Sequence, residues 1–205
     1  IKSKRSEKGK PVIIGGDARF LSDKFCAAAA EVMAGNGIKA LVCDRDTPTP
    51  VIAYEIIRRK AAGGINFTAS HNPPEYNGLK FSPSWGGPAT PAETSVIESN
   101  IRKVKVVKTV GMDEGQKRGL IQVFDPSPFY LKRIKEIVDF SVIKSSRMKV
   151  VADPLFSTGR GYLDRLLKEA GANVTVINDR KDVLFGGFPP EPAEKNVADL
   201  IAAVK

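Results

Sequence analysis

The sequence INFTASHNPPEYNGLKF occupies residues 65–81 and sets the pattern for the rest of the chain. Its first residues are apolar, follow Gly63-Gly64 and are too few for a helix, which predicts a short buried strand. Asn72-Pro73-Pro74 then forces a turn, because a residue before proline is pushed out of the α-helical region. Asn77-Gly78 is a second turn signal, after which residues 79–81 can return as a strand.

The predicted turn carries four side chains that suit phosphoryl chemistry. They are the hydroxyl of Ser70, the imidazole of His71, the amide of Asn72 and the ammonium of Lys80. A serine oxygen can carry a phosphate if neighbouring groups stabilise its charge and move protons. Lys80 can neutralise phosphate charge or act as an acid or base, and His71 is the chain's only histidine. The residue types alone nevertheless favour an ordinary exposed turn, in which Ser70 and Asn72 bond local backbone.

The segments before this turn predict alternating strands and helices. Apolar strands are expected at residues 11–16, 38–43 and 63–67, with helices beginning near Ser22 and Thr49. This order requires parallel pairing with right-handed crossovers. Ligands bind at the carboxyl ends of strands in such sheets, which is where the turn lies.

The helix boundaries follow from local signals. Ser22 is expected to cap the first helix, and Gly35-Asn36-Gly37 to end it. Thr49 is expected to cap the second helix, with proline in its first turn, and Thr90 and Glu93 form a capping box for a third. The residues predicted to share the buried face of the first helix are Phe25, Ala28, Ala29, Val32 and Met33.

Residues 105–119 lose this pattern to charge and glycine, and we predict a domain boundary there. The first domain would be residues 1–117 and the second residues 118–205. Beyond the boundary the sequence predicts an edge strand, a helix, and a further strand–helix–strand unit, followed by a last helix capped by Asn196. The predicted fold class is α/β: two three-layer α/β/α domains with mixed, mostly parallel sheets, the second incomplete.

The complete string of the turn is similar to the phosphoserine loop of the α-D-phosphohexomutases, the phosphoglucomutases and phosphomannomutases. The similarity is carried by residues 68–73 and 76–81, a match far more specific than a lone glycine motif. It implies that Ser70 holds the transferable phosphate and contributes an oxygen to Mg²⁺. It also implies that Lys80 is a general acid or base, that His71 belongs to the active site and that Asn72 supports the loop.

The resemblance implies a mutase that moves a phosphate between the 1- and 6-positions of a hexose through a phosphoserine and a bisphosphate. Residues 17–22, 47–50 and 188–192 also resemble family segments, but the family's Asp-Gly-Asp-x-Asp-Arg metal loop does not occur in the sequence. We therefore expect a fragment, inactive alone, with the remaining aspartate ligands of Mg²⁺ outside it. A non-catalytic phosphosugar-binding or regulatory relative is the alternative. The choice of glucose or mannose phosphate, the oligomeric state and the phosphorylation of Ser70 stay open.

Three other polar segments are assigned structural roles. Asp17 and Arg19 are expected to form a local ion pair that organises a turn. Residues 44–46 carry two carboxylates around an arginine and lack a third oxygen ligand, so a solvated strand end is expected there, not a magnesium site. Residues 157–161 lack the Gly-Lys-Ser/Thr ending of a Walker motif and are expected to cap a helix more than to cradle an anion. Residues 47–50 are given no catalytic part.

Composition and motifs argue against several other classes of protein. The formal charge is +9, but the basic runs lack interleaved aromatic residues, so no nucleic-acid partner is expected. No apolar run reaches the length of a membrane span, and the basic start lacks the apolar core of a signal peptide. Cys26 and Cys43 have no metal-binding spacing. We expect the protein to be cytoplasmic, where the reducing environment keeps thiols free, and we expect both cysteines to be small core residues. Gly-x-Ser-x-Gly is absent around Ser70, which disfavours a serine hydrolase.

Overall fold

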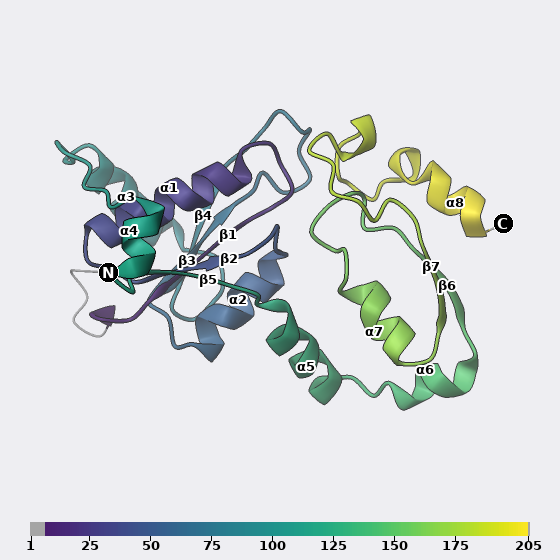
Figure 1. Cartoon of the computed structure of the whole chain (residues 1–205). Helices are drawn as coiled ribbons and strands as arrows, with labels where there is room; N and C mark the ends of the chain where they lie inside the picture. Colours follow the sequence, from purple (N-terminus) through teal and green to yellow (C-terminus); the bar gives the residue numbers. More distant parts are fainter. Residues whose placement is uncertain (1–6, 205) are drawn as a thin grey trace.

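The computed structural model of the chain describes residues 7–204, in which two α/β units follow each other along the chain (Figure 1). The first unit contains β1 (Val12–Gly16), α1 (Ser22–Gly35), β2 (Ala40–Cys43), α2 (Thr49–Arg58), β3 (Gly63–Phe67), β4 (Leu79–Pro83), α3 (Pro91–Ile101), α4 (Met112–Lys117) and β5 (Ile121–Phe124). The connection and the second unit contain α5 (Ser127–Ile137), α6 (Ser141–Ser146), β6 (Lys149–Ala152), α7 (Leu163–Glu169), β7 (Asn173–Val176), η2 (Phe185–Gly187), η3 (Glu194–Asn196) and α8 (Ala198–Val204).

The first sheet has five strands in the order β4-β3-β1-β2-β5, and only β4 runs antiparallel to its neighbour. The three inner strands are β3, β1 and β2, the apolar segments on which the prediction of parallel pairing rested. The predicted return strand after Asn77-Gly78 is β4, which pairs with β3 from Gly63–Pro83 to Phe67–Leu79. The predicted fold class, α/β with a mixed and mostly parallel sheet, is confirmed.

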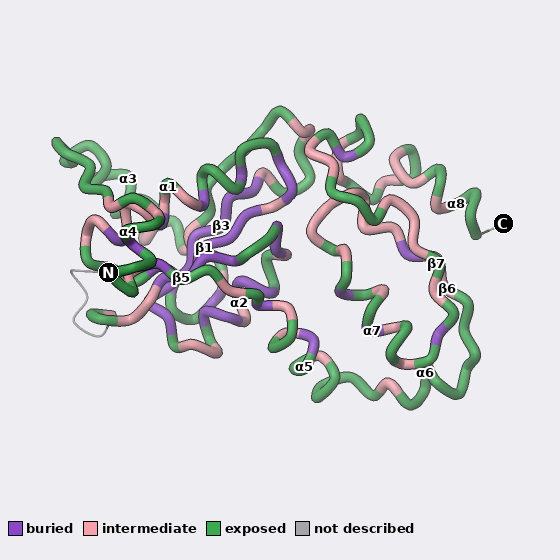
Figure 2. The backbone as a smooth tube through the Cα atoms, viewed as in Figure 1, coloured by how far each residue is buried: buried purple, intermediate pink, exposed green. Residues whose placement is uncertain are grey.

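Helices cover both faces of this sheet because its side chains alternate between them. Val12 and Ile14 point into the core under α1, whereas Ile13 points into the core under α2. All three are fully buried, and Figure 2 shows buried backbone concentrated in β1 and β3. The unit therefore has three layers, with one apolar core on each side of the sheet.

Helix α1 presents a different face to the sheet from the predicted one. Its buried residues are Ser22, Cys26, Ala30 and Ala34, while Phe25 is 38% exposed. Small residues face the sheet because the helix crosses close to it: a Cβ on Gly16 would lie 3.2 Å from Cys26 Sγ and from Ser22 Cβ. The predicted apolar face was wrong in its centre, although Ala29 and Met33 do pack at the edge of the core.

The capping predictions have mixed outcomes. The capping box of Thr90 and Glu93 is present, and α1 ends at Gly35 as predicted. The Ser22 and Thr49 caps were wrong, because both residues lie inside their helices and neither helix has a side-chain cap. Ser22 Oγ donates instead to Asp17, Thr49 Oγ1 accepts from Asn66, and the Asn196 amide donates to the carbonyls of Pro189 and Glu191 instead of capping α8.

The second unit is built on a smaller sheet. Strands β6 and β7 pair in parallel, α7 packs on β7, and α8 contacts β6. Most of this unit is intermediate or exposed in Figure 2. Its main buried cluster joins it to the first unit, because Tyr162 and Leu166 pack with Leu131 of α5 and Val51 of α2.

The predicted division between residues 117 and 118 stays a prediction. Strand β5 pairs with β2, so the first sheet extends past residue 117. Helix α4, which lies in the segment expected to be irregular, contacts α1. Within residues 7–204 no helix is both long enough and apolar enough to span a membrane.

Candidate active site

A cavity of about 430 Å³ lies at the carboxyl ends of the strands of the first sheet, between the two units. The first unit contributes loops that follow β1, β2 and β3, and the loops after β1 and β2 lead to helices on opposite faces of the sheet. This topology opens a crevice at the strand ends. The residues that line it are Asp17, Thr47, Thr49, Asn66, Thr68, Ser70 and His71 from the first unit, with residues 153–155, 157–159, 190 and 192 facing them.

Ser70 is an exposed residue that lines this cavity. It follows β3 by three residues and has a φ of +60°, a conformation that L-residues other than Asn and Asp seldom adopt. Such strain costs on the order of 1–3 kcal/mol and persists only where the surroundings enforce it. The Ser70 hydroxyl lies 3.3 Å from His71 Nδ1, so a proton can pass between the two side chains.

Hydrogen bonds through Thr68 to Asp17 hold Ser70 in this conformation. The Ser70 backbone N–H donates to Thr68 Oγ1 at 3.0 Å, and Thr68 Oγ1 donates to Asp17 Oδ2 at 2.7 Å. The other Asp17 oxygen accepts from the Arg19 backbone N–H and from Ser22 Oγ. Asp17 therefore connects the end of β1 to the loop after β3, which we name the Ser70 loop (residues 68–78).

Arg19 is the residue that sequence reasoning undervalued most. The predicted ion pair with Asp17 is present at 3.0 Å, but the Arg19 side chain is only 1% exposed and also reaches across to the Ser70 loop. Its two terminal nitrogens donate to four backbone carbonyls, those of residues 70, 72, 73 and 76. The signal available in the sequence was an arginine two residues after an aspartate at the end of a buried strand.

Of the other predicted site residues, His71 lines the cavity, whereas Asn72 and Lys80 do not. Asn72 is exposed and contributes its backbone carbonyl to Arg19. Lys80 is opposite Asn66 in the β3–β4 register, so the two side chains leave the sheet on the same face. Lys80 is therefore on the same face of the sheet as Asn66, which lines the cavity, but Lys80 is not itself among the lining residues.

The second unit forms the opposite wall through residues 153–159. Leu155 and Phe156 both have positive φ, and Leu155 N–H is bonded to Asp153 Oδ1. Ser157 and Thr158 line the cavity. The predicted helix cap at residues 157–161 was wrong, because α7 begins at Leu163 without a side-chain cap.

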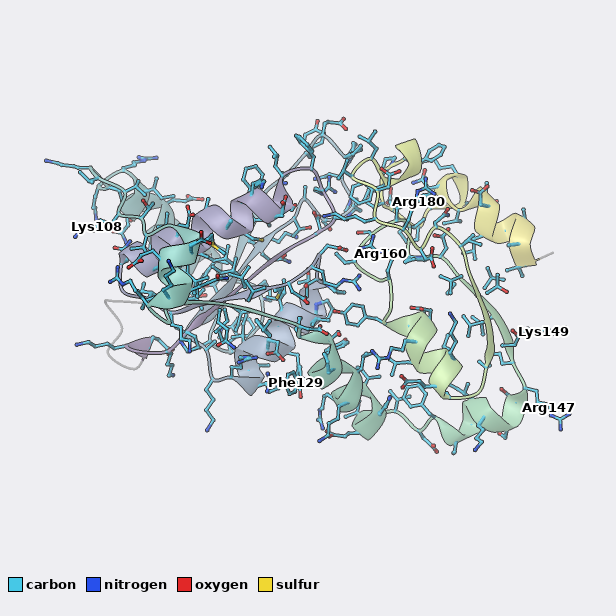
Figure 3. All side chains as sticks on the ribbon, viewed as in Figure 1. Lys108, Phe129, Arg147, Lys149, Arg160 and Arg180 are labelled. Atoms are coloured by element: carbon cyan, nitrogen blue, oxygen red, sulfur yellow. The ribbon has the colours of Figure 1, made fainter. Side chains whose placement is uncertain are left out.

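Asp46 links the two walls and was also predicted wrongly. It is 8% exposed, not solvated, and its Oδ1 accepts from Arg160 Nη2 at 2.6 Å. Arg45 Nη2 donates to the backbone carbonyl of Arg160 at 3.1 Å, and Figure 3 labels Arg160 in the region between the units. Thr47 and Thr49, which had been given only a structural role, line the cavity beside this pair.

Other chemistries are less well supplied at this site. Burial raises the pKa of the Cys26 and Cys43 thiols to about 12, so neither provides a thiolate near neutral pH. Residues 7–204 contain no group of three or more His, Cys, Asp or Glu side chains placed to hold a metal ion. Each Asp17 oxygen already accepts two hydrogen bonds from the protein, so this carboxylate is a poor candidate for a metal ligand or a general base.

Comparison with known proteins places the chain in a family. Residues 1–108 match the sequence model for "Phosphoglucomutase/phosphomannomutase, alpha/beta/alpha domain I", and residues 128–205 match the model for domain II. The chain is 32% identical to a phosphoglucomutase of Komagataeibacter xylinus over 188 residues, covering 85% of this chain and 34% of that protein. It is 34% identical to a Methanosphaera stadtmanae protein assigned as a phosphoglucosamine mutase, covering 97% of this chain and 42% of that protein.

Solved structures agree with these matches. The chain superposes on a Thermus thermophilus protein assigned as a phosphomannomutase with a TM-score of 0.86 and 30% identity, covering 96% of this chain and 44% of that one. Parafusin from Paramecium shares the fold, with a TM-score of 0.79 and 22% identity, over 96% of this chain and 41% of that chain. The chain thus spans about two-fifths of the length of these relatives. By its sequence and by its fold, it belongs to the phosphoglucomutase/phosphomannomutase family.

Proposed function

We propose that the protein containing this chain is a phosphohexomutase in which Ser70 carries the phosphate. One observation carries the proposal: an exposed serine hydroxyl is held in a strained loop at the mouth of a polar cavity where parallel strands end. The Ser70 backbone N–H is held by Thr68, which is held in turn by Asp17, so the end of β1 determines where Ser70 lies. Family membership supplies the reaction class.

The proposed reaction has two phosphoryl transfers. In the first, the bond between phosphorus and Ser70 Oγ breaks while a hydroxyl of the bound hexose phosphate forms a new bond to phosphorus and loses its proton. The product is a hexose bisphosphate and a free Ser70 hydroxyl. After the sugar reorients, its other phosphate returns to Ser70, and the isomeric hexose phosphate leaves. Positioning and charge stabilisation dominate the barrier of such transfers.

Side chains of this chain have distinct parts in that proposal. His71, at 3.3 Å from Ser70 Oγ, would hold or release the Ser70 proton as the ester is broken and remade. Lys80, on the same face of the sheet as Asn66, would contact phosphate or take the proton of the sugar hydroxyl. Asn66 Oδ1 is buried without a hydrogen-bond partner among residues 7–204, and it would accept a hydrogen bond from a ligand in the cavity it lines. Asn72 supports the loop through its carbonyl.

The donor set fits Mg²⁺ only in part. A phosphorylated Ser70 would offer a charged oxygen, the kind of ligand that Mg²⁺ prefers. The described residues supply no further carboxylate cluster, so the remaining ligands would have to come from outside this chain. When bound, the cation would neutralise charge on the transferring phosphoryl group. We infer from this that the chain alone is inactive.

A coupled mutase assay of the longer protein tests the proposal. The panel should contain the 1- and 6-phosphates of glucose, mannose and glucosamine, because the relatives are named as phosphoglucomutases, phosphomannomutases and phosphoglucosamine mutases. Ser70→Ala is expected to lose turnover by at least about 10⁴-fold, since it removes the atom that accepts the phosphate. Ser82→Ala, on β4 away from the cavity wall, should leave turnover unchanged. Substantial mutase activity in Ser70→Ala would refute the role of Ser70, and a longer protein that binds these sugars without turnover would favour the non-catalytic alternative.

A further inference from the structure

We propose that Arg19 is a positioning residue for phosphoryl transfer, which holds the Ser70 loop in the conformation that presents Ser70 Oγ to the cavity. The inference rests on the proposed function, and it assigns to Arg19 a role beyond its ion pair with Asp17. It follows from the hydrogen bonds of one guanidinium group.

All five N–H donors of this guanidinium are used. Nε donates to Asp17 Oδ2 at 3.0 Å. Nη1 donates to the carbonyls of Pro73 at 2.6 Å and Tyr76 at 2.9 Å, and Nη2 donates to those of Ser70 at 3.1 Å and Asn72 at 2.7 Å. Arginine is the only side chain with five donors in a planar fork, so no other residue can make this set of contacts.

These contacts determine the shape of the Ser70 loop. The four carbonyls belong to one seven-residue stretch, and their dipoles all point at the same cation. Without the cation, they would face one another in a site from which water is largely excluded, an arrangement that costs free energy. One of them is the carbonyl of Ser70 itself, whose N–H is held by Thr68, so both sides of the strained residue are tied.

The second unit shields Arg19 from solvent. The Arg19 Cζ atom lies 5.2 Å from the centre of the Phe185 ring, and Phe185 is 3% exposed. A cation beside an aromatic face is stabilised most where water is excluded. Arg19 therefore belongs to the junction of the two units, yet it is not among the residues that line the cavity. It would act on the reaction through Ser70 and not by touching the substrate.

The variant Arg19→Lys separates positioning from simple stability. Lysine keeps the charge but offers three donors from a single atom, so it cannot span four carbonyls and Asp17. In the longer protein we expect kcat to fall about 100-fold, as for a displacement of about 1 Å at a reacting group, while KM changes less than about 3-fold. Arg58→Met is the matched control, because Arg58 also binds a carboxylate (Glu55) and an aromatic ring (Phe129) but lies at the far end of α2.

Amide hydrogen exchange provides a readout that does not depend on activity. Peptides spanning residues 68–78 should exchange at least about 10-fold faster in Arg19→Lys than in the wild type, and at the wild-type rate in Arg58→Met. If Arg19→Lys does not fold, Asp17→Asn weakens the anchor of the same guanidinium and should change the same peptides by a smaller factor.

The outcomes distinguish this inference from the proposed function. Faster exchange of residues 68–78 together with a fall in kcat at nearly constant KM supports it. Wild-type kcat in a folded Arg19→Lys protein, or unchanged exchange of these peptides, overturns it. If the wild-type longer protein has no mutase activity, the proposed function fails, and the exchange comparison alone decides whether Arg19 holds the loop.

Discussion

Replacing Arg160 with methionine should destabilise the chain by about 3 kcal/mol, because it would leave a buried carboxylate without a partner. The Arg160 and Asp46 side chains are 11% and 4% exposed, and their contact is 2.6 Å long. The second oxygen of Asp46 has no hydrogen-bond partner within residues 7–204. Without Arg160, neither oxygen of this carboxylate would be bonded by the described part of the chain.

The magnitude follows from comparing two backgrounds. Removing one partner of a buried ion pair costs about 3–5 kcal/mol, and the adjacent cavity, which Thr47 and Gly159 line, admits water and places Asp46 at the low end. In Asp46→Asn the buried charge is gone, so removing Arg160 costs only one ordinary hydrogen bond, about 1 kcal/mol. The expected coupling energy between the two residues is therefore about 2 kcal/mol.

Urea unfolding of the wild type, both single variants and the double variant measures this coupling directly. The matched control is the Arg133–Glu136 pair of α5, whose side chains are both 48% exposed and whose coupling should be about 0.5 kcal/mol or less. A coupling energy for Asp46 and Arg160 as small as that of the exposed pair would refute the reasoning, because it would mean that Asp46 is not desolvated at the junction.

Two further predictions test the packing of the first unit. Gly35→Ala should lower the free energy of unfolding in urea by about 1–2 kcal/mol although alanine favours helices, because its Cβ would overlap the backbone carbonyl group of Lys108, which cannot rotate away; an unchanged urea midpoint would contradict this. Cys26 and Cys43 should resist a disulfide reagent at pH 8 in the folded chain and react fully in urea, because burial raises the pKa of each thiol from 9.0 to about 12. Rapid reaction of the native thiols would show that they are not buried. The raised pKa values also make the free energy of unfolding depend on pH: it should be unaffected by these thiols below pH 9 and should fall as the pH rises from 9 toward 12, because the thiols ionise first in the unfolded chain.

Local signals in the sequence were sufficient for the elements of the sheet. The apolar runs at Val12, Ala40 and Gly63 became neighbouring parallel strands, and Asn77-Gly78 preceded an antiparallel return. The capping box at Thr90 also formed. Each of these features depends on residues that are close in sequence, where periodicity and turn chemistry act directly.

The failures arose where distant residues decide the outcome. Arg19 bonds carbonyls 51–57 positions away, and Asp46 bonds an arginine 114 positions away, so no local pattern indicates either contact. The buried face of α1 differs from the predicted one because the close approach of the helix at Gly16 selects Cys26 and the small residues in line with it, a contact that helical periodicity alone does not show. Thr49 was wrong as a cap because its hydroxyl accepts a hydrogen bond from Asn66, 17 positions away on β3. Ser22 was wrong for a more local reason, because its hydroxyl donates to Asp17, five positions earlier.

The most direct test of the phosphate-carrier role follows the phosphoryl group itself. The longer protein is incubated with a hexose bisphosphate carrying ³²P, and the labelled peptide is mapped by mass spectrometry. We predict one labelled site per chain, at Ser70, and transfer of that label to sugar when unlabelled hexose phosphate is added. Label on any other residue, or label on Ser70 that the added sugar phosphate does not remove, would contradict the account.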